Sequence, residues 1–168
     1  PGSTLIYNIF QNAGHSRTSG IEVILSQNFE KWAVVNLNLN AYQNTIDAFS
    51  VLNKYPQENT FSADRQQITS GSVKLNGLFH LRKSWDLQVT AVYMAPDIIP
   101  QGKIYARTYV DAGIKRTIQK GKGEMFLNVT DLFNTLRIKR TTTGDGFHLE
   151  STDCYETQVF RLGYTYKF

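Results

Sequence analysis

The chain ends with Gln158-Val159-Phe160-Arg161-Leu162-Gly163-Tyr164-Thr165-Tyr166-Lys167-Phe168. From Phe160 onward, every second residue is large and apolar or aromatic, and the residues between them are small, polar or charged. A period of two over this length predicts a β-strand with one apolar face and one polar face. Such a strand can complete a membrane barrel or a soluble β-sandwich, so the rest of the chain must decide between them.

Length and composition favour a β-protein. The chain has 168 residues, which suits one domain or a piece of a larger protein. Its mean hydropathy is −0.33, and no apolar run approaches the roughly 18 residues that a transmembrane helix needs. This excludes a helical membrane protein but not a barrel, whose alternating strands have modest hydropathy. Nine Tyr and ten Phe residues favour strands over helices.

The sequence carries no recognisable catalytic or metal-binding motif. The single cysteine, Cys154, excludes an internal disulfide and argues against a metal cage. None of the three histidines, His15, His80 and His148, has metal-ligand spacing to another His or Cys. The net charge of +4 comes from scattered basic residues, which argues against nucleic acid as a partner. We therefore expect no enzymatic activity, no cofactor and no metal site.

Alternating patterns divide the chain into about eight consecutive strands. The predicted segments are 4–13, 20–29, 32–42, 68–82, 85–95, 103–115, 124–139 and 158–168. The clearest segment is 32–42, in which Val35, Leu37 and Leu39 alternate with asparagines. Asparagines along one face would leave costly unsatisfied amides in a dry core, but they can line a water-filled lumen.

Short and long connections alternate strictly along the chain. Short turns are predicted around Glu30, Lys83 and Lys120, and longer loops around His15, Pro56, Pro100 and Gly144. The stretch 50–67 is predicted to be a long polar loop, and 14–19 a polar turn. Outer-membrane barrels have short periplasmic turns and long outer loops, whereas a soluble Greek key has no reason to alternate in this way. The prediction is an all-β, antiparallel, up-and-down transmembrane β-barrel.

The two faces of the predicted strands agree with a barrel. Charges of both signs at similar depth suit a hydrated interior and are expensive against lipid. Aromatic rings beside the short turns suit the headgroup zone. The predicted lumen-facing residues are Glu22, Asn36, Asn38, Asn40, Lys74, Asn76, Arg107, Asp111 and Lys115. The predicted membrane-interface aromatics are Trp32, Trp85, Tyr164, Tyr166 and Phe168.

Three segments together resemble a known family: Gly20-Ile-Glu-Val, Asn128-Val-Thr-Asp-Leu-Phe-Asn134 and Arg161-Leu-Gly-Tyr-Thr-Tyr-Lys-Phe168. They look like the C-terminal part of the barrel of TonB-dependent outer-membrane receptors, especially the branch common in Bacteroidota. The resemblance runs from about Leu5 to Phe168. It implies a location in the outer membrane and energy-coupled uptake of a scarce nutrient such as a siderophore, vitamin or glycan. Such receptors have about 22 strands around a plug, so residues 1–168 would be the last strands of the barrel, without the plug.

The resemblance also implies partners. These are outer-membrane lipid, the barrel-assembly machinery through the C-terminal strand, and the TonB complex through an N-terminal part that is missing here; a surface lipoprotein is a further candidate. Ligand contacts would come from the long loops and the upper lumen. The candidates, placed by topology, are Tyr55, Asn59, Arg65, Asp97, Gln101, Arg140, Asp145 and His148.

The segment 130–135 breaks the alternation of its strand. Asp131 would continue the apolar face of Met125, Leu127 and Val129, where a carboxylate does not belong. We interpret it as a bulge or as the point where the strand leaves the bilayer, after the roughly 9–11 residues that suffice to cross. The expected role of Asp131 and Asn134 is structural, hydrogen-bonding an irregular backbone.

Two other functions fit the same pattern. A self-contained eight-stranded barrel could be a structural or adhesive membrane protein, since small natural barrels of this kind exist. A soluble β-barrel could bind a small apolar ligand. A plug upstream of this chain would establish the receptor. A signal peptide that ends just before Thr4 would establish the small barrel, and folding in water without detergent would establish the soluble protein.

Overall fold

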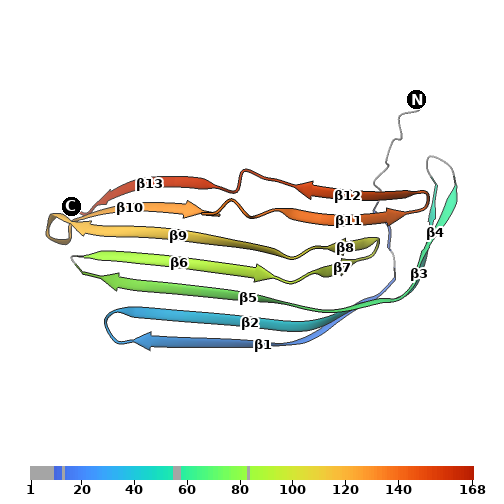
Figure 1. Cartoon of the computed structure of the whole chain (residues 1–168), viewed down its shortest axis with the longest axis horizontal. Coiled ribbons are helices and arrows are strands. Elements are labelled where there is room, and N and C mark those ends of the chain that lie inside the picture. Colours follow the sequence, from blue (N-terminus) through green and yellow to red (C-terminus); the bar gives the residue numbers. More distant parts are fainter. Residues whose placement is uncertain (1–9, 13, 55–57, 83) are drawn as a thin grey trace, which may run out of the picture.

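The computed structural model describes residues 10–12, 14–54, 58–82 and 84–168. Its main feature is a seven-stranded antiparallel sheet in which strand order follows chain order (Figure 1). The strands are β1 (Ser16–Phe29), β2 (Ala33–Ile46), β5 (Gln66–Leu81), β6 (Trp85–Met94), β9 (Arg107–Ile118), β10 (Gly123–Thr130) and β13 (Val159–Tyr166). The described residues therefore have the up-and-down arrangement that the alternating patterns predicted.

Two smaller sheets extend beyond one end of the main sheet (Figure 1). One contains β7 (Asp97–Ile99), β8 (Gly102–Ile104), β11 (Ile138–Gly144) and β12 (Phe147–Asp153), in the order β12-β11-β8-β7. The other is the hairpin of β3 (Phe49–Asn53) and β4 (Asn59–Ala63). At the opposite end, the 3₁₀ turn η1 (Gln119–Gly121) connects β9 to β10.

Short and long connections lie at opposite ends of the sheet, as predicted. Phe168 lies beside the short turns, and the extended hairpins lie at the other end (Figure 1). Glu30, Ser84 and Lys120 have positive φ values of 49°, 65° and 58°, which allow the chain to reverse within a few residues. Lys83 and Pro56, which mark two of the predicted connections, lie outside the described residues.

The strand register separates an apolar face from a polar face, because directly paired residues point to the same side of a sheet. One row across the sheet is apolar: Leu25, Leu37, Leu75, Ala91 and Val110. The neighbouring row is polar: Ser26, Asn36, Asn76, Thr90 and Asp111. The period of two in the sequence thus corresponds to an apolar surface and a polar surface on opposite sides of the sheet.

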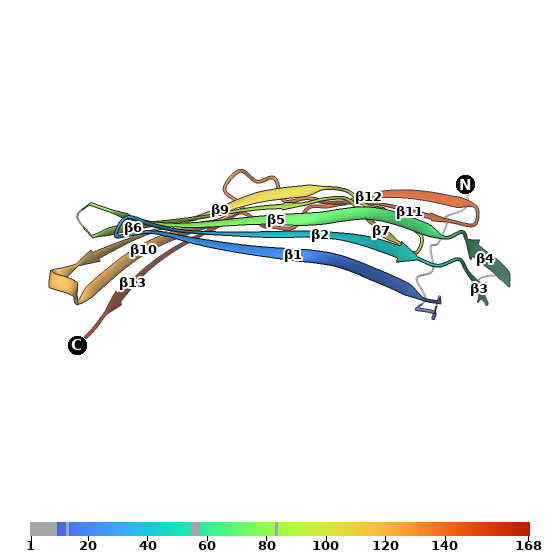
Figure 2. The same ribbon diagram turned by 90° about the horizontal axis from the view of Figure 1, so that it is seen from below.

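The sheet is bowed and open. Figure 2 shows its curvature edge-on, and no strand among the described residues pairs with the outer edge of β1 or of β13. Among those residues, the buried apolar side chains are only Ala33, Ile46, Val92 and Val129, whereas Leu162 is 77% exposed. The fold therefore lacks the dry two-layer core that a soluble sandwich requires.

The main sheet contains strands for seven of the about eight predicted segments. The predicted segment 4–13 lies mostly outside the described residues, and its described part, 10–12, is not a strand. The polar turn predicted at 14–19 is wrong, because β1 begins at Ser16. Residues 16–19 are polar yet form a ladder with β2, since strand pairing can continue outside an apolar environment.

The long polar loop predicted at 50–67 does connect two strands of the main sheet, but most of it forms the hairpin β3–β4, and β5 begins at Gln66. Two predicted strands are each divided in two. The segment 103–115 contains β8 and β9, and 124–139 contains β10 and the start of β11. In both places the backbone leaves the main sheet and resumes pairing in the four-stranded sheet, a change of partner that alternation alone does not reveal.

Candidate functional site on the polar face

Amide and hydroxyl side chains form short hydrogen-bonded groups across the middle of the polar face. Asn38 Nδ2 donates to Glu22 Oε1 at 2.8 Å, linking β2 to β1. Thr90 Oγ1 and Gln88 Nε2 donate to Asn76 Oδ1 at 2.8 and 3.2 Å, linking β6 to β5. These side chains remain at least partly exposed, so they keep hydrogen-bonding capacity for water or for a polar ligand.

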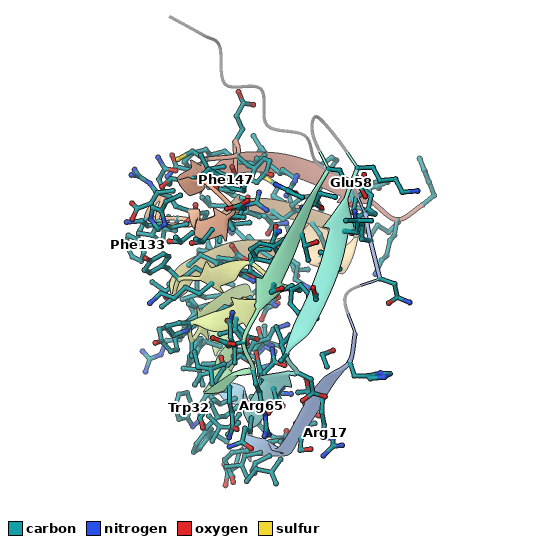
Figure 3. The ribbon with its side chains drawn as sticks, turned by 90° about the vertical axis from the view of Figure 1, so that its right-hand side faces the viewer. Arg17, Trp32, Glu58, Arg65, Phe133 and Phe147 are labelled. Atoms are coloured by element: carbon teal, nitrogen blue, oxygen red, sulfur yellow. The ribbon has the colours of Figure 1, made fainter. Side chains whose placement is uncertain are left out.

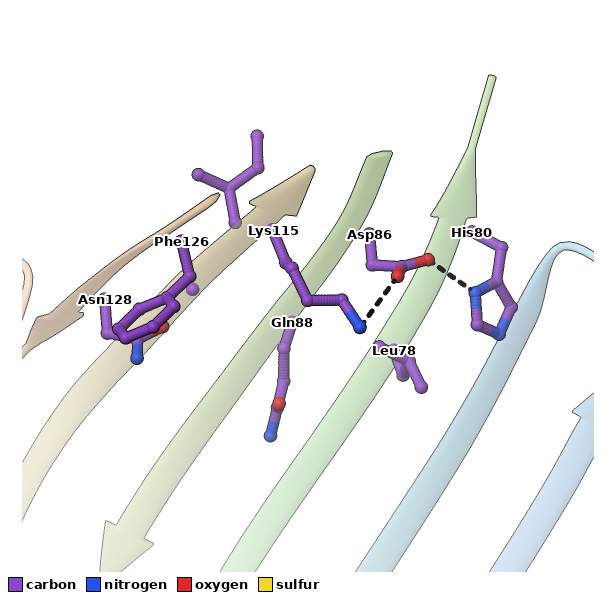
Figure 4. A pocket seen from close by; sticks show the side chains of 9 residues that line it. Leu78, His80, Asp86, Gln88, Lys115, Phe126 and Asn128 are labelled. Atoms are coloured by element: carbon purple, nitrogen blue, oxygen red, sulfur yellow. Dashed lines mark hydrogen bonds and ion pairs between the residues drawn. The ribbon is translucent and has the colours of Figure 1, made fainter. Parts of the chain in front are cut away.

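A hollow of about 470 Å³ lies on the polar face near the short turns (Figure 4). His80 Nδ1 is 2.7 Å from Asp86 Oδ1, and Lys115 Nζ is 3.5 Å from Asp86 Oδ2. A Cβ placed on Gly163 would collide with the ring of Phe126, so this ring covers the space above the glycine. The hollow combines an aromatic wall with a carboxylate held between an imidazole and an ammonium group.

Asp97 fastens the start of β7 to the polar face of β2. Its Oδ2 accepts a 2.7 Å hydrogen bond from Tyr42 OH, and its Oδ1 accepts bonds from Asn44 Nδ2 at 2.9 Å and from Ile98 N at 2.8 Å. Burial alone would raise the pKa of Asp97, but the bonds from Asn44, Tyr42 and Ile98 N outweigh it and hold the pKa below its ordinary value. The β7–β8 hairpin is thereby held against the polar face at its long-connection end.

Asp131 organises the irregular backbone after β10. The residue is 1% exposed and has a φ of 46°. Its carboxylate accepts hydrogen bonds from Thr135 N at 2.9 Å, Leu136 N at 3.0 Å and Thr157 Oγ1 at 2.5 Å. The predicted structural role of Asp131 is confirmed, and β10 ends at Thr130 as expected. Asn134 has a left-handed backbone conformation with a φ of 53°, and its backbone N–H donates a 2.8 Å hydrogen bond to Asp131 O.

The structure places the nine residues predicted to face a lumen on one face of the sheet. The register connects eight of them in three rows. Glu22, Asn40 and Arg107 share the first row, and Asn38 and Lys74 share the second. Asn36, Asn76 and Asp111 share the third. Lys115 continues the same face beside Asp86. That this face lines a water-filled lumen stays a prediction.

The residues predicted to contact a ligand are spread over the long-connection end. Tyr55 lies outside the described residues. The structure brings together Asn59 and Asp145, whose Nδ2 and Oδ2 atoms are 3.3 Å apart although the residues belong to different hairpins. Arg65 Nε lies 3.9 Å from Asp47 Oδ1, and Asp97 is the residue that anchors β7.

The other three candidates lie in the four-stranded sheet. Gln101 is in the β7–β8 turn, where its carbonyl accepts a hydrogen bond from Thr143 N. Arg140 on β11 donates from Nη2 to Asp153 Oδ2. His148 on β12 has its Nδ1 3.3 Å from Thr143 Oγ1. The candidates share one end of the molecule but do not converge on a single pocket.

The predicted interface aromatics lie near the short turns. Phe29 and Trp32 have ring centroids 5.3 Å apart, and Tyr166 and Phe168 have theirs 5.4 Å apart. The register places Trp85 and Tyr164 in one row of the apolar face. Contact between these rings and lipid headgroups stays a prediction.

Sequence reasoning did not select several residues that organise this face. Tyr42 and Asn44 hold Asp97, and Asp86 sits between His80 and Lys115. Alternation does place Asp86 on the polar face, because Trp85 and Leu87 flank it, but it gives no sign of the contacts with His80 and Lys115. The contact of Asp97 with β2 has no signal in the sequence, since it depends on how the β7–β8 hairpin folds back.

No group of three or more His, Cys, Asp or Glu side chains in the described part of the chain could hold a metal ion. Within the same residues, no helix has the length and apolar character to cross a membrane. Cys154 is exposed.

Comparison with known proteins gives one match. The model of a family described as the outer membrane protein beta-barrel family matches residues 2–166. This range extends through the last strand, β13, and includes every residue of the polar face described above. Searches of curated proteins and of solved structures gave no match.

Proposed function

The chain belongs to the outer membrane protein β-barrel family and is a protein of the bacterial outer membrane, and from this premise we propose that it forms the last strands of a TonB-dependent receptor. The receptor would import a scarce nutrient such as a siderophore, a vitamin or a glycan. The plug and the segment that contacts the TonB complex would lie upstream of residue 1.

The observation that supports this proposal is the polar face of the open sheet, which we call the polar wall. In a closed barrel of about eight strands, side chains fill the interior. Here the side chains of the polar face, such as Asn36 and Asn76, bond mainly to the next strand and leave the space in front of the wall free. A gently curved sheet with two unpaired edges supports a segment of a wide barrel, whose remaining strands would pair with β1 and β13.

The polar wall also bears on the class of ligand. Amides and hydroxyls bind polar, uncharged groups, and two of the charges on this face, Asp86 and Lys115, are paired with each other. We propose that recognition involves the long-connection end, where Asn59, Asp145 and Arg140 lie, and that transport proceeds without covalent chemistry. A surface lipoprotein could cover this end, and β13 would present the chain to the barrel-assembly machinery.

The decisive test is the size of the native protein in its own membranes. An antibody raised against this chain should detect, in the outer-membrane fraction, a protein several times larger than 19.1 kDa. A band near 19.1 kDa that shifts on heating would identify a complete small barrel and overturn the transport proposal. Family membership already argues against the soluble barrel, since it places the chain in the outer membrane.

A second experiment tests energy coupling. In living cells, chemical cross-linking should join the full-length protein to TonB. Deletion of the segment upstream of residue 1 that contacts TonB should abolish the cross-link while the barrel remains in the membrane. A large protein that never cross-links to TonB would contradict energy-coupled import.

A further inference from the structure

Two lysines flank one tyrosine at the long-connection end of the molecule. Lys103 Nζ lies 4.8 Å, and Lys139 Nζ 5.0 Å, from the centre of the Tyr105 ring. Thr141 Oγ1 donates a 3.1 Å hydrogen bond to Tyr105 OH, which fixes the ring between β8 and β11. Arg137 lines the same hollow as Tyr105 and Lys139. We call Lys103, Tyr105, Arg137 and Lys139 the Tyr105 cluster.

The Tyr105 cluster lies on the apolar side of the molecule. Tyr105 and Lys139 line a hollow of about 420 Å³ together with Tyr93 and Thr108. Tyr93 and Thr108 are paired in the register and belong to the row that contains Val73, on the apolar face. Arg107, at the start of β9, also lines this hollow, so the cluster lies at the edge of the main sheet, next to the last residues of the apolar face.

The cluster also lies just beyond the apolar band. Tyr93 is the last residue of the apolar face on β6, and it is 45% exposed. Phe133, which is 66% exposed, lies on the same side of the molecule as Trp32 (Figure 3). The long connections of outer-membrane barrels are extracellular, so this position corresponds to the headgroup level of the outer leaflet.

The charge of the cluster is incompletely balanced. Lys139 Nζ is 3.8 Å from Glu150 Oε2, and His148 Nε2 is 4.0 Å from Glu150 Oε1. Within the described residues, no salt bridge involves Lys103 or Arg137. Lys103, beside the Tyr105 ring, and Arg137, in the lining of the same hollow, thus have no acidic partner among the described residues.

We propose that the Tyr105 cluster binds a phosphate-bearing headgroup of an outer-leaflet lipid. Long basic side chains extend along apolar surface and place their charges at the interface, while Tyr suits the headgroup zone. Lys and Arg together offer point charges and a planar fork to phosphate oxygens. The proposal rests on the location in the outer membrane and on the position of the cluster. It does not depend on transport, so either proposal can fail alone.

The test compares lipid retention by two variants of the full-length protein. Protein immobilised in mild detergent is incubated with a fluorescent, doubly phosphorylated lipid A and with the same lipid after removal of its phosphates. The triple variant K103Q/R137Q/K139Q should retain the phosphorylated lipid at least about tenfold less than the wild type, because each basic residue near a surface attracts anionic lipid. Retention of the dephosphorylated lipid should not differ between the two proteins.

The matched control removes three positive charges from exposed residues of the short connections: K31Q/K120Q/K122Q. It should retain the phosphorylated lipid as the wild type does. Equal losses in both triple variants, or no loss in the K103Q/R137Q/K139Q variant, would overturn the proposal. Displacement of the lipid by equimolar inorganic phosphate would show a site for free phosphate and would also overturn it. A heat-dependent gel shift, compared for all three proteins, confirms that each is folded.

Discussion

At the scale of single residues, Asp131 is the most deeply buried polar side chain among the described residues. A carboxylate that is 1% exposed would be costly without partners, yet it accepts bonds from two backbone N–H groups and two threonine hydroxyls. Burial would raise the pKa of Asp131, but the bonds from Thr157, Thr135 and Leu136 prevail and lower it. Asp131 thereby allows β10 to end and the chain to leave the sheet without unpaired backbone groups.

Asp131→Ala should lower the free energy of unfolding by about 3 kcal/mol, because it leaves buried N–H groups without an acceptor. The measurement is urea unfolding of the protein in lipid vesicles. Asn134→Gly is the matched control, since its φ of 53° suits glycine and its side chain can be removed without loss of that conformation. Equal stability of the Asp131→Ala variant and the wild type would show that the bonds of this carboxylate contribute nothing.

The stability contributed by Asp131 should depend on pH. Its pKa is lower in the folded state than the value of about 3.9 expected in the unfolded chain. The contribution is therefore complete above about pH 4–5 and is lost as the pH falls through the folded-state pKa. Urea midpoints between pH 6 and pH 3 should fall less for Asp131→Asn than for the wild type. Parallel midpoint curves for the two proteins would contradict this linkage.

At the scale of elements, the strands are longer than a bilayer requires. β1 and β2 have 14 residues each and β5 has 16, whereas about 9–11 residues cross the hydrocarbon. The excess carries the sheet beyond the apolar band, where β7, β8, β11 and β12 pair with one another. Each strand therefore has a middle part with two unlike faces and a polar continuation.

The unlike faces predict opposite results for two neighbouring residues of β2. Leu37→Arg places a charge in an apolar row and should cost about 2–4 kcal/mol if that row faces the middle of the bilayer. Asn38→Arg should lower the free energy of unfolding much less, because residue 38 belongs to the polar face and lies beside Glu22. The measurement is the urea midpoint of the heat-modifiable form in vesicles. Similar losses from both variants would indicate a packed core on both faces.

The contact of β7 with β2 predicts a local effect. Asp97→Ala removes the acceptor for Tyr42 OH and Asn44 Nδ2, so the β7–β8 hairpin should open more often. Hydrogen exchange should accelerate about tenfold at residues 97–104, which corresponds to the loss of about one net hydrogen bond. Tyr42→Phe removes one of the two bonds and should give a smaller increase. Unchanged exchange in Asp97→Ala would show that other contacts hold the hairpin.

At the scale of the whole molecule, the environment must complete the fold. The apolar face has no layer packed on it in the described residues, and the outer edges of β1 and β13 are unpaired. In a bilayer, each unpaired backbone group costs several kcal/mol, which is why spanning sheets close. A wide barrel in the outer membrane satisfies both needs, with lipid against the apolar face and further strands at the edges.

The open edges make a prediction for the isolated chain. Residues 1–168 refolded into vesicles should not give a compact monomer, because the edges of β1 and β13 would stay unpaired in lipid. The measurement is gel migration of unheated and heated samples. A fast-migrating form that disappears on heating would show that the chain closes on itself, as a self-contained barrel does.

The faces of the strands could be predicted because alternation is a local property. The residues of the main sheet that were predicted to be polar-facing, such as Asn38 and Lys74, lie on one face in the register. Strand ends could not be predicted equally well. Residues 16–19 and the hairpin β3–β4 have polar sequences, and their strands depend on pairing with another segment.

The candidate site was predictable only in part for the same reason. The long connections were correctly expected at one end of the sheet, and ligand binding there stays a prediction. The partners of Asp97 and the approach of Asn59 to Asp145 join residues 53–86 positions apart. Such contacts depend on how hairpins fold over the sheet, for which neither spacing nor composition carries a signal.

The all-β class, the alternation of short and long connections and the division into two unlike faces could all be predicted from the amino-acid sequence. Each of these follows from residues within one strand or one turn, through the period of two and the turn-forming residues. The strand register, the second sheet beyond the first, the burial of Asp131 and the position of the Tyr105 cluster became known only from the three-dimensional fold. These depend on which backbone groups find partners far along the chain, because every N–H and C=O removed from water must be paired.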